Sequence, residues 1–225
     1  MTTPDLAALA LTAWLAFATT AVLLVIGTPL AWWLARTESA GKPFIEALVA
    51  LPLVLPPTVL GFYLLLLFNP GAPLGAFWLS VTGDTLTFSF AGLVVASVVY
   101  SLPFMVQPLA SAFSSVARAP MEAAASLRAS PLDAFFSVAV PLSARGFITA
   151  AVLTFAHTLG EFGVVLMVGG NLPDRTRVVS IAIYEHVETL AYREAHALSA
   201  ILLLVSFVVL TLVYAFNRRH SVRVG

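Results

Sequence analysis

The sequence predicts an all-α integral membrane protein with about five transmembrane helices, and three observations support this fold class. Of the 225 residues, 60% are hydrophobic and only 10% are charged, whereas a soluble domain carries roughly 25% charged residues. The mean hydropathy is +0.98, and long apolar runs recur from one end of the chain to the other. We expect a single membrane domain over residues 1–225, because neither an internal repeat nor a low-complexity segment divides it.

Each long apolar run matches the length that a helix needs to cross a bilayer, which is about 20 residues. Charged residues are almost absent from these runs, and more polar segments separate them. The predicted spans are Leu9–Leu34, Ala47–Phe68, Leu86–Leu109, Phe147–Val168 and Leu198–Phe216.

Two segments depart from this simple pattern. The second span contains Pro56 and Pro57, which lack backbone N–H groups and interrupt a helix. This predicts either a kinked packing helix or a hinge that lines a pore. The segment Val178–Ala191 is amphipathic and carries Glu185 and Glu188, so we expect an interfacial or partly re-entrant helix there rather than a sixth span.

The distribution of Lys and Arg predicts an N-terminus outside the cell and a C-terminus in the cytoplasm, because cytoplasmic loops carry an excess of basic residues. With five alternating spans, eight basic residues fall on one side and three on the other. The predicted cytoplasmic set is Arg36, Lys42, Arg118, Arg128, Arg145, Arg218, Arg219 and Arg223, and the outer set is Arg175, Arg177 and Arg193.

Composition also excludes several functions. The net charge is zero and no basic stripe is present, which argues against nucleic-acid binding. The chain has no cysteine, so thiolate metal sites are excluded, and no metal-ligand spacing was found. It contains no P-loop and no catalytic constellation in a span. We therefore expect no enzyme activity and no cofactor in this chain.

The segment over about residues 117–146 is polar and lies between the third and fourth spans. Pro120 is suited to the first turn of a helix that Met121–Leu127 continues. Ser130 is then positioned to cap a second helix over Leu132–Ala139, with Asp133 three residues later. The pattern predicts a helix–turn–helix unit, either an ordinary interfacial loop or a docking site for another protein.

This segment resembles the cytoplasmic coupling loop of ABC importer permeases. The family pattern has Glu-Ala-Ala followed by a glycine and a terminal proline, and the chain has Glu122-Ala123-Ala124 and Pro141. Arg128 stands where the family usually has glycine, and Ser130-Pro131 is an alternative site for the turn. The resemblance implies that an ATPase subunit is coupled through Glu122, Ala123, Ala124, Arg128, Ser130, Pro131 and Pro141.

Two further stretches resemble the molybdate branch of these permeases. They are LPLVLPPTVLGFYLL in the second span and the stretch from Thr158 to Glu188, which contains LGEFG and GGN. Sulfate, thiosulfate and tungstate permeases share similar patterns, so these substrates remain alternatives, and a membrane enzyme is a more distant one. The resemblance implies a type I importer fold in the bacterial cytoplasmic (inner) membrane.

The same resemblance implies a set of partners. They are a second copy of the chain in a homodimer, two cytoplasmic ATPase subunits that bind ATP, an extracytoplasmic molybdate-binding protein, and membrane lipid. Alternating access driven by those subunits is the mechanism that it implies.

Glu161 is the only acidic residue inside the predicted spans. An intramembrane carboxylate is costly and indicates function, but it would repel a dianion. We therefore expect a structural or gating role, shared with Pro56 and Pro57. His157 lies four residues earlier, so the two side chains could form a hydrogen bond along one helix.

The outer end of the fourth span is the third candidate site. Its glycines and Asn171 are followed closely by Arg175 and Arg177. These arginines either dock the binding protein and attract the anion, or are solvated loop charges. The predicted outer-mouth residues are Gly169, Gly170, Asn171, Arg175 and Arg177.

Overall fold

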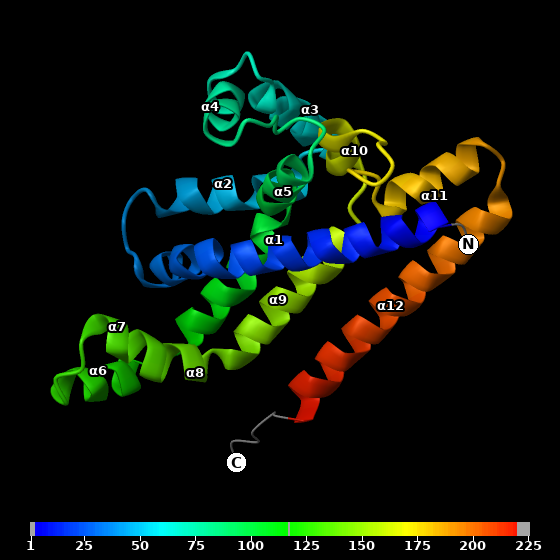
Figure 1. Ribbon diagram of the computed structural model, residues 1–225. Coiled ribbons are helices and arrows are strands. Elements are labelled where there is room, and N and C mark those ends of the chain that lie inside the picture. Colours follow the sequence, from blue (N-terminus) through cyan, green and yellow to red (C-terminus); the bar gives the residue numbers. More distant parts are fainter. Residues whose placement is uncertain (1–2, 117, 220–225) are drawn as a thin grey trace.

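A computed structural model describes residues 3–116 and 118–219, and every regular element in these ranges is a helix (Figure 1). Ala117 and Arg223, which belong to the predicted coupling loop and to the predicted cytoplasmic charges, lie outside the described residues. The elements are α1 (Thr3–Arg36), α2 (Lys42–Val54), α3 (Pro57–Phe68), α4 (Pro73–Thr82), α5 (Phe90–Ser115), α6 (Arg118–Ser126), α7 (Pro131–Ala134), the π-helix η1 (Phe135–Ala139), α8 (Val140–Leu142), α9 (Ala144–Leu159), α10 (Gly163–Gly169), α11 (Val179–Glu188) and α12 (Tyr192–Arg219).

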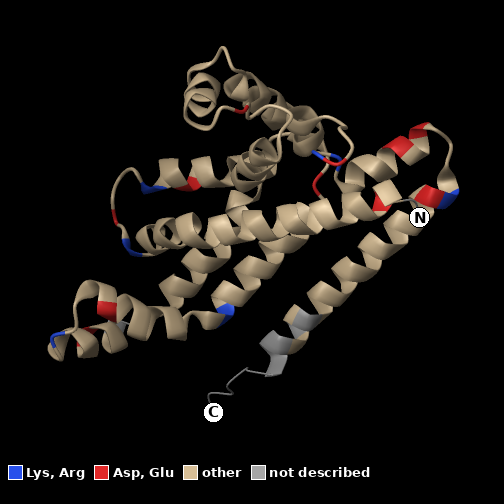
Figure 2. Cartoon of the chain, viewed as in Figure 1, with Lys and Arg blue, Asp and Glu red and all other residues tan. Residues whose placement is uncertain are grey.

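Three of the helices are long and apolar enough to cross a membrane unbroken. They are α1, α5 and the part of α12 over Tyr192–Thr211. Two bent pairs of helices raise the number of candidate spans to five, so the predicted membrane fold is confirmed. Figure 2 shows that charged residues gather at the ends of the long helices and in the loops, which leaves their middle portions uncharged.

The second predicted span is broken rather than kinked. Helices α2 and α3 meet at Leu55–Pro56 with a bend of 111°. Leu55 is extended, with φ −71° and ψ 137°, as expected for a residue that precedes a proline. Pro56 and Pro57 supply no N–H to continue the ladder of α2, so the chain turns sharply here.

The prediction of a continuous fourth span over Phe147–Val168 is wrong. Helix α9 ends at Leu159, the chain is non-helical at residues 160–162, and α10 begins separately at Gly163. The bent pair that could cross here consists of Pro131–Leu142 and Ala144–Leu159, with an angle of 73°. The sequence on both sides of residues 160–162 is mainly apolar, so hydropathy predicts one continuous span and does not indicate the break.

The core lies where α1, α5 and α9 pack together (Figure 1). Leu15 of α1 packs with Leu93 of α5, and Gly27 faces Met105 further along. In both pairs the residue number in α5 exceeds the residue number in α1 by the same amount. The two helices therefore run parallel and remain in register. This places Thr19 level with Ser97.

Helix α11 has ten residues, which is half the length required to cross a bilayer. It packs against α1 and α12, and the N–H of Val179 donates to the hydroxyl of Thr12 over 2.8 Å. The prediction that this segment is not a sixth span is confirmed.

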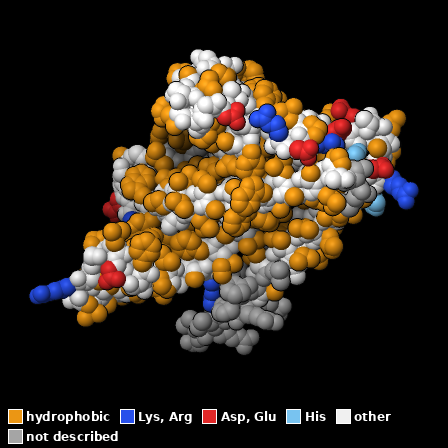
Figure 3. Space-filling view, in the orientation of Figure 1, with side chains coloured by type: hydrophobic (Ala, Val, Ile, Leu, Met, Phe, Trp, Pro, Cys, Tyr) orange, Lys and Arg blue, Asp and Glu red, His pale blue; other side chains and the backbone are white. Residues whose placement is uncertain are grey.

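The outer surface of the long helices is apolar. Figure 3 shows hydrophobic side chains over much of the face that α1 crosses. Phe17 and Val25 on α1 are exposed, as are Leu203 and Phe207 on α12. A surface of this kind is suited to lipid or to another membrane subunit.

Candidate functional site

The predicted coupling residues lie together in a hairpin at one end of the molecule (Figure 1). Helix α6 carries Glu122, Ala123 and Ala124, and the first two are exposed. Leu127 follows α6 directly with 84% of its surface exposed. Sequence reasoning missed Leu127, although a leucine in so polar a stretch is a signal for a contact surface. Pro141 lies further on, in α8.

Arg128 adopts the conformation that glycine usually supplies. Its φ is +62°, in the left-handed region that L-residues avoid. The N–H of Arg128 donates to the carbonyl of Ala125 over 2.9 Å, and that of Ala129 donates to Ala124 over 3.0 Å. This pair of bonds is a Schellman motif, so the glycine-type turn is kept without glycine.

Ser130 adds a cap to the next helix and does not replace this turn. Its hydroxyl accepts a hydrogen bond from the N–H of Asp133 over 3.2 Å, and Pro131 occupies the first turn of α7. The Asp133 carboxylate accepts from the Ser137 hydroxyl over 2.9 Å. The predicted helix–turn–helix unit is therefore confirmed, with a π-helix in its second arm.

The helices that follow the two interruptions, α3 after Leu55–Pro56 and α10 after residues 160–162, meet where they begin. A Cβ atom on Gly163 would lie 2.8 Å from Cβ of Pro57, so α3 and α10 touch where both begin. One turn further on, a Cβ on Gly61 would lie 2.8 Å from Cβ of Met167. The structure thus brings Pro57, one of the predicted gating prolines, beside the segment that holds Glu161.

Glu161 is buried at the break between α9 and α10, with 4% of its surface exposed. Its carbonyl accepts a hydrogen bond from the hydroxyl of Ser180 over 2.6 Å. Ser97 lies beside its carboxylate. Within the described residues, however, neither carboxylate oxygen reaches hydrogen-bonding geometry with any partner.

The expected pairing of His157 with Glu161 is wrong. The two residues do not share a helical face, because α9 ends at Leu159. Nδ1 of His157 instead lies 2.9 Å from the hydroxyl of Ser101, and its ring stacks on Phe104 with centroids 4.0 Å apart.

Buried hydroxyl groups occur on α1, α5 and α9, the three helices that form the core, and sequence reasoning missed them. Ser101 also pairs with Thr158 over 3.1 Å. The hydroxyls of Thr19, Ser97 and Thr154 are buried and have no hydrogen-bond partner in the ranges that the structure describes. The spacing of Ser97 and Ser101, four residues apart in an apolar run, was a signal for a polar helix face.

Two of the residues predicted to lie at the outer mouth converge on Glu185 of α11. Arg177 forms an ion pair with Oε2 of Glu185 over 2.9 Å, and Asn171 donates to the same oxygen over 2.8 Å. Only 11% of the Arg177 side chain is exposed. The alternative in which Arg177 is a solvated loop charge is therefore wrong, whereas Arg175 is exposed.

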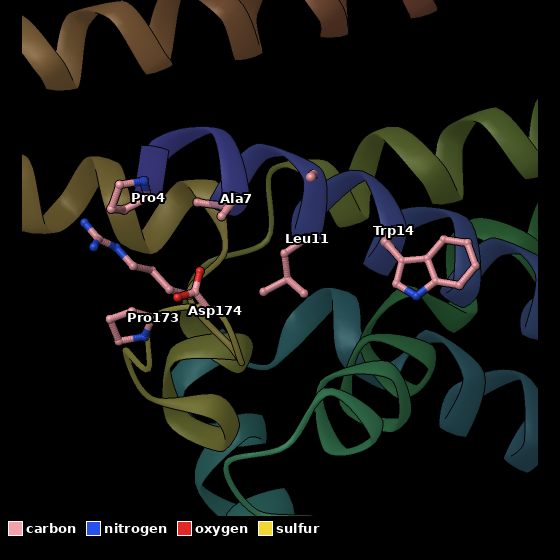
Figure 4. Close-up of a pocket in the computed structure, with 9 residues that line it drawn as sticks. Pro4, Ala7, Leu11, Trp14, Pro173 and Asp174 are labelled. Atoms are coloured by element: carbon pink, nitrogen blue, oxygen red, sulfur yellow. The ribbon is translucent and has the colours of Figure 1, made fainter. Parts of the chain in front are cut away.

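The two glycines form the turn that leads into this loop. The carbonyl of Gly169 accepts from the hydroxyl of Thr176 over 2.7 Å, and Gly170 has φ +64°. The loop then borders a hollow of about 350 Å³ against the start of α1. In Figure 4, Pro173 and Asp174 face Ala7 and Leu11 across this hollow.

No group of three or more His, Asp or Glu side chains able to hold an ion occurs in the described parts of the chain. His186 is instead paired with Asp5, with Nε2 and Oδ1 2.9 Å apart. This contact joins α11 to the start of α1.

Comparison with known proteins agrees with this architecture. The chain is 58% identical over 214 residues to the molybdenum transport system permease protein ModB of Azotobacter vinelandii, and the match covers 95% of each chain. It is 32% identical to the sulfate transport system permease protein CysT of Synechocystis, over 88% of this chain and 70% of that one.

Solved structures show the same fold at low sequence identity. A bacterial ABC transporter that imports alginate matches with a TM-score of 0.74 and 16% identity, covering 99% of this chain and 82% of that one. The MetNI methionine transporter matches with a TM-score of 0.69 and 16% identity, covering 97% and 99%. Residues 25–224 match the family of binding-protein-dependent transport system inner membrane components, and the chain is a member of this family of transport subunits.

Proposed function

We propose that this chain is the membrane-spanning subunit of an ATP-driven importer of molybdate. The observation that carries this proposal is the 58% identity to a molybdenum transport permease along 95% of the chain. In the proposed assembly, two copies form the pathway in the bacterial cytoplasmic membrane. Two ATPase subunits dock on the inside, and a molybdate-binding protein docks on the outside.

The hairpin of α6 and α7 is the proposed ATPase contact. Its exposed α6 face combines the small residue Ala123 with the apolar Leu127 and the charged Glu122. A partner can approach a small residue closely, and an exposed leucine is stabilised when it is covered. The hairpin also leads through α8 into α9, so movement at the docking site is transmitted to the buried break at Glu161.

The pathway is proposed to hold the anion only briefly. A lasting site for a dianion is built from arginine forks or helix N-termini, and the five predicted spans contain no Lys or Arg. Affinity would then reside in the binding protein, and the permease would switch between outward-facing and inward-facing states.

In this arrangement the N-terminus is outside and the α6–α7 hairpin is cytoplasmic. The chain has no cysteine, so single cysteines report orientation directly. We expect a cysteine at Ser126 to react with a membrane-impermeant maleimide only from the cytoplasm, and one at Thr82 only from outside. Both positions are exposed. The opposite labelling would overturn the orientation and the docking role together.

Transport itself is tested in vesicles that contain the chain with its ATPase subunits. Added binding protein and ATP should drive uptake of labelled molybdate, and ADP should not. Glu122→Lys and Ala124→Arg should lower uptake or uncouple ATP hydrolysis from transport. Each places a bulky or reversed charge on the α6 face that is proposed to pack closely against the ATPase. Glu38→Lys, an exposed charge reversal outside the hairpin, is the matched control and should transport normally.

Sulfate is the second candidate substrate, because sulfate permeases are 31–34% identical to this chain. Molybdate and sulfate share a tetrahedral shape and a charge of −2, so the permease alone discriminates poorly between them. Titration of the associated binding protein with each anion decides the question. Tighter binding of sulfate than of molybdate would replace the first proposal with the second.

A further inference from the structure

We propose that a groove between α1 and the α7–η1 segment binds one acyl chain of an anionic phospholipid, with the phosphate at Arg36. The groove has a volume of about 660 Å³, within the range of about 300–1,000 Å³ that is typical of ligand sites. One wall is α1 and the other is the second arm of the hairpin. Its lining includes Leu24, Thr28, Trp32, Leu132, Phe135 and Phe136.

The lining suits a hydrocarbon chain because it presents no free polar group. Thr28 is polar, but its hydroxyl donates to the carbonyl of Leu24 within its own helix. The α1 wall extends from Leu24 to Trp32, which at 1.5 Å per residue is about 12 Å along the helix. One leaflet has an apolar depth of about 15 Å, so the groove accommodates most of a chain that lies parallel to α1.

The groove is preformed at the end nearest the hairpin. Trp32 contacts Phe113 and Phe135 edge to face, and both pairs of ring centroids are 5.1 Å apart. Phe113 is fully buried and also meets Phe147 with centroids 5.7 Å apart. A cluster of this kind holds the two walls at a fixed distance, so binding would require little rearrangement.

Arg36 supplies the headgroup contact. Its guanidinium lies over the ring of Trp32, with Cζ 4.3 Å from the centroid, and it is exposed in the last turn of α1. No carboxylate forms an ion pair with it in the described residues. The nearest acids in sequence to the groove are Glu38 and Asp133, and Asp133 is turned toward Ser137 of its own arm.

This charge pattern favours a lipid over a second copy of the chain. A helix packed into the groove from another copy would lie against Trp32, whose ring carries the Arg36 guanidinium, and would need to supply an acid there. A phospholipid brings its own negative charge in a form that a guanidinium fork matches well. The surface of α1 outside the groove also continues as exposed Val25, Ile26 and Trp33, as expected for a helix that faces lipid.

The test uses the full chain in phosphatidylcholine vesicles with Trp32 as the only tryptophan. Trp14, Trp33 and Trp78 are replaced by Phe for this purpose. Brominated phosphatidylglycerol and brominated phosphatidylcholine are then compared as quenchers of Trp32 fluorescence. We expect phosphatidylglycerol to occupy the site with about a fivefold preference, the size of effect associated with one basic side chain near a membrane surface.

Two controls isolate the groove. A chain with Trp33 as the only tryptophan has its probe one residue away but outside the groove lining, and it should show no preference. Arg36→Gln should abolish the preference of the Trp32 chain, and Arg36→Lys should retain part of it. Equal quenching by the two lipids, or a preference that survives Arg36→Gln, would overturn the proposal.

A cysteine at Val25 tests the competing occupant. Val25 borders the groove and is 73% exposed, and the chain has no other cysteine. We expect no disulfide between two copies when oxidant is added to vesicles. Efficient cross-linking would mean that the groove is covered by a second copy and would likewise overturn the lipid assignment.

Discussion

Gly163 lies against Pro57 so closely that a Cβ atom on the glycine would come within 2.8 Å of Cβ of the proline. This contact joins the start of α10 to the start of α3, which are the two places where a predicted span is interrupted. The proline ring cannot rotate away, and the backbone N of Thr58 lies 3.4 Å from the same position. The packing of α10 on α3 therefore depends on the absence of a side chain at residue 163.

The first prediction follows from this contact. Gly163→Ala should separate α3 from α10 and lower the free energy of unfolding by about 1–3 kcal/mol, as overpacking typically does. Thermal unfolding of the purified chain in detergent measures the effect. Gly160→Ala is the matched control, because a Cβ there would lie 3.8 Å from its nearest neighbour, the carbonyl of His157. Equal stability of the two variants would contradict the close-packed junction.

The second prediction concerns Arg128, which has φ +62°. An L-residue in this conformation costs roughly 1–2 kcal/mol, and glycine does not. Arg128→Gly should therefore stabilise the turn and slow hydrogen exchange at the N–H of Ala129 by about fivefold. Arg128→Val should accelerate exchange, because a β-branched residue is strained further at positive φ.

Leu190 offers an independent control for this effect. It follows α11 with φ +61°, and the N–H of Ala191 donates to the carbonyl of His186 over 2.7 Å. Leu190→Gly should slow exchange in its own turn and leave the turn after α6 unchanged. If Arg128→Gly instead weakens assembly with the ATPase, the arginine side chain contributes a contact that outweighs its backbone strain.

Composition and local pattern sufficed to predict much of the fold. An apolar run of about 20 residues has few alternatives to a membrane helix, because every backbone polar group must be satisfied internally. The cap at Ser130 was predictable for a similar reason, since a serine followed by proline and an acid forms its hydrogen bonds locally. Pro56 and Pro57 indicated an interruption, although the size of the bend was not encoded locally.

The remaining features depend on partners that are distant in sequence. The break at residues 160–162 has only Gly160 as a local signal, and the contact that follows it, Gly163 on Pro57, joins residues far apart in the sequence. The Arg177–Glu185 pair requires α11 to fold back beside the loop. His157 and Glu161 are four residues apart, and this spacing pairs them only on a continuous helix, whereas α9 ends at Leu159 before it reaches Glu161.

The third prediction tests the ion pair between Arg177 and Glu185. Its nitrogen and oxygen lie 2.9 Å apart, but 39% of the Glu185 side chain is exposed, so water screens the pair. A double-mutant cycle with Arg177→Ala and Glu185→Ala should give a coupling energy of about 0.5–1 kcal/mol. Thermal unfolding of the four proteins at low and high salt measures it, and the coupling should fall as salt rises.

Arg175→Ala serves as the comparison for that cycle. Arg175 is exposed in the same loop and forms no ion pair within the described part of the chain. Its replacement should leave stability unchanged within about 0.5 kcal/mol. A loss of transport with normal stability in Arg175→Ala would assign this residue to the anion or to the binding protein.

The last prediction is that Glu161 supports the switch between states and does not bind the substrate. Its carboxylate is buried beside Ser97, and neither oxygen has a hydrogen-bond partner among the described residues. Glu161→Gln preserves the size of the side chain and replaces the carboxylate by a neutral amide that still needs buried hydrogen-bond partners, so the free energy of unfolding should change by no more than about 1–3 kcal/mol. Transport should fall, because the break at residues 160–162 is where a rearrangement of α9 against α10 would bring the carboxylate to new partners.

A carboxylate in the path of a dianion would repel it, so the ratio of molybdate to sulfate uptake should stay the same. Ser97→Ala, which removes the neighbouring hydroxyl without changing the charge, should have the smaller effect on transport. A changed ratio in Glu161→Gln would show that the side chain faces the substrate.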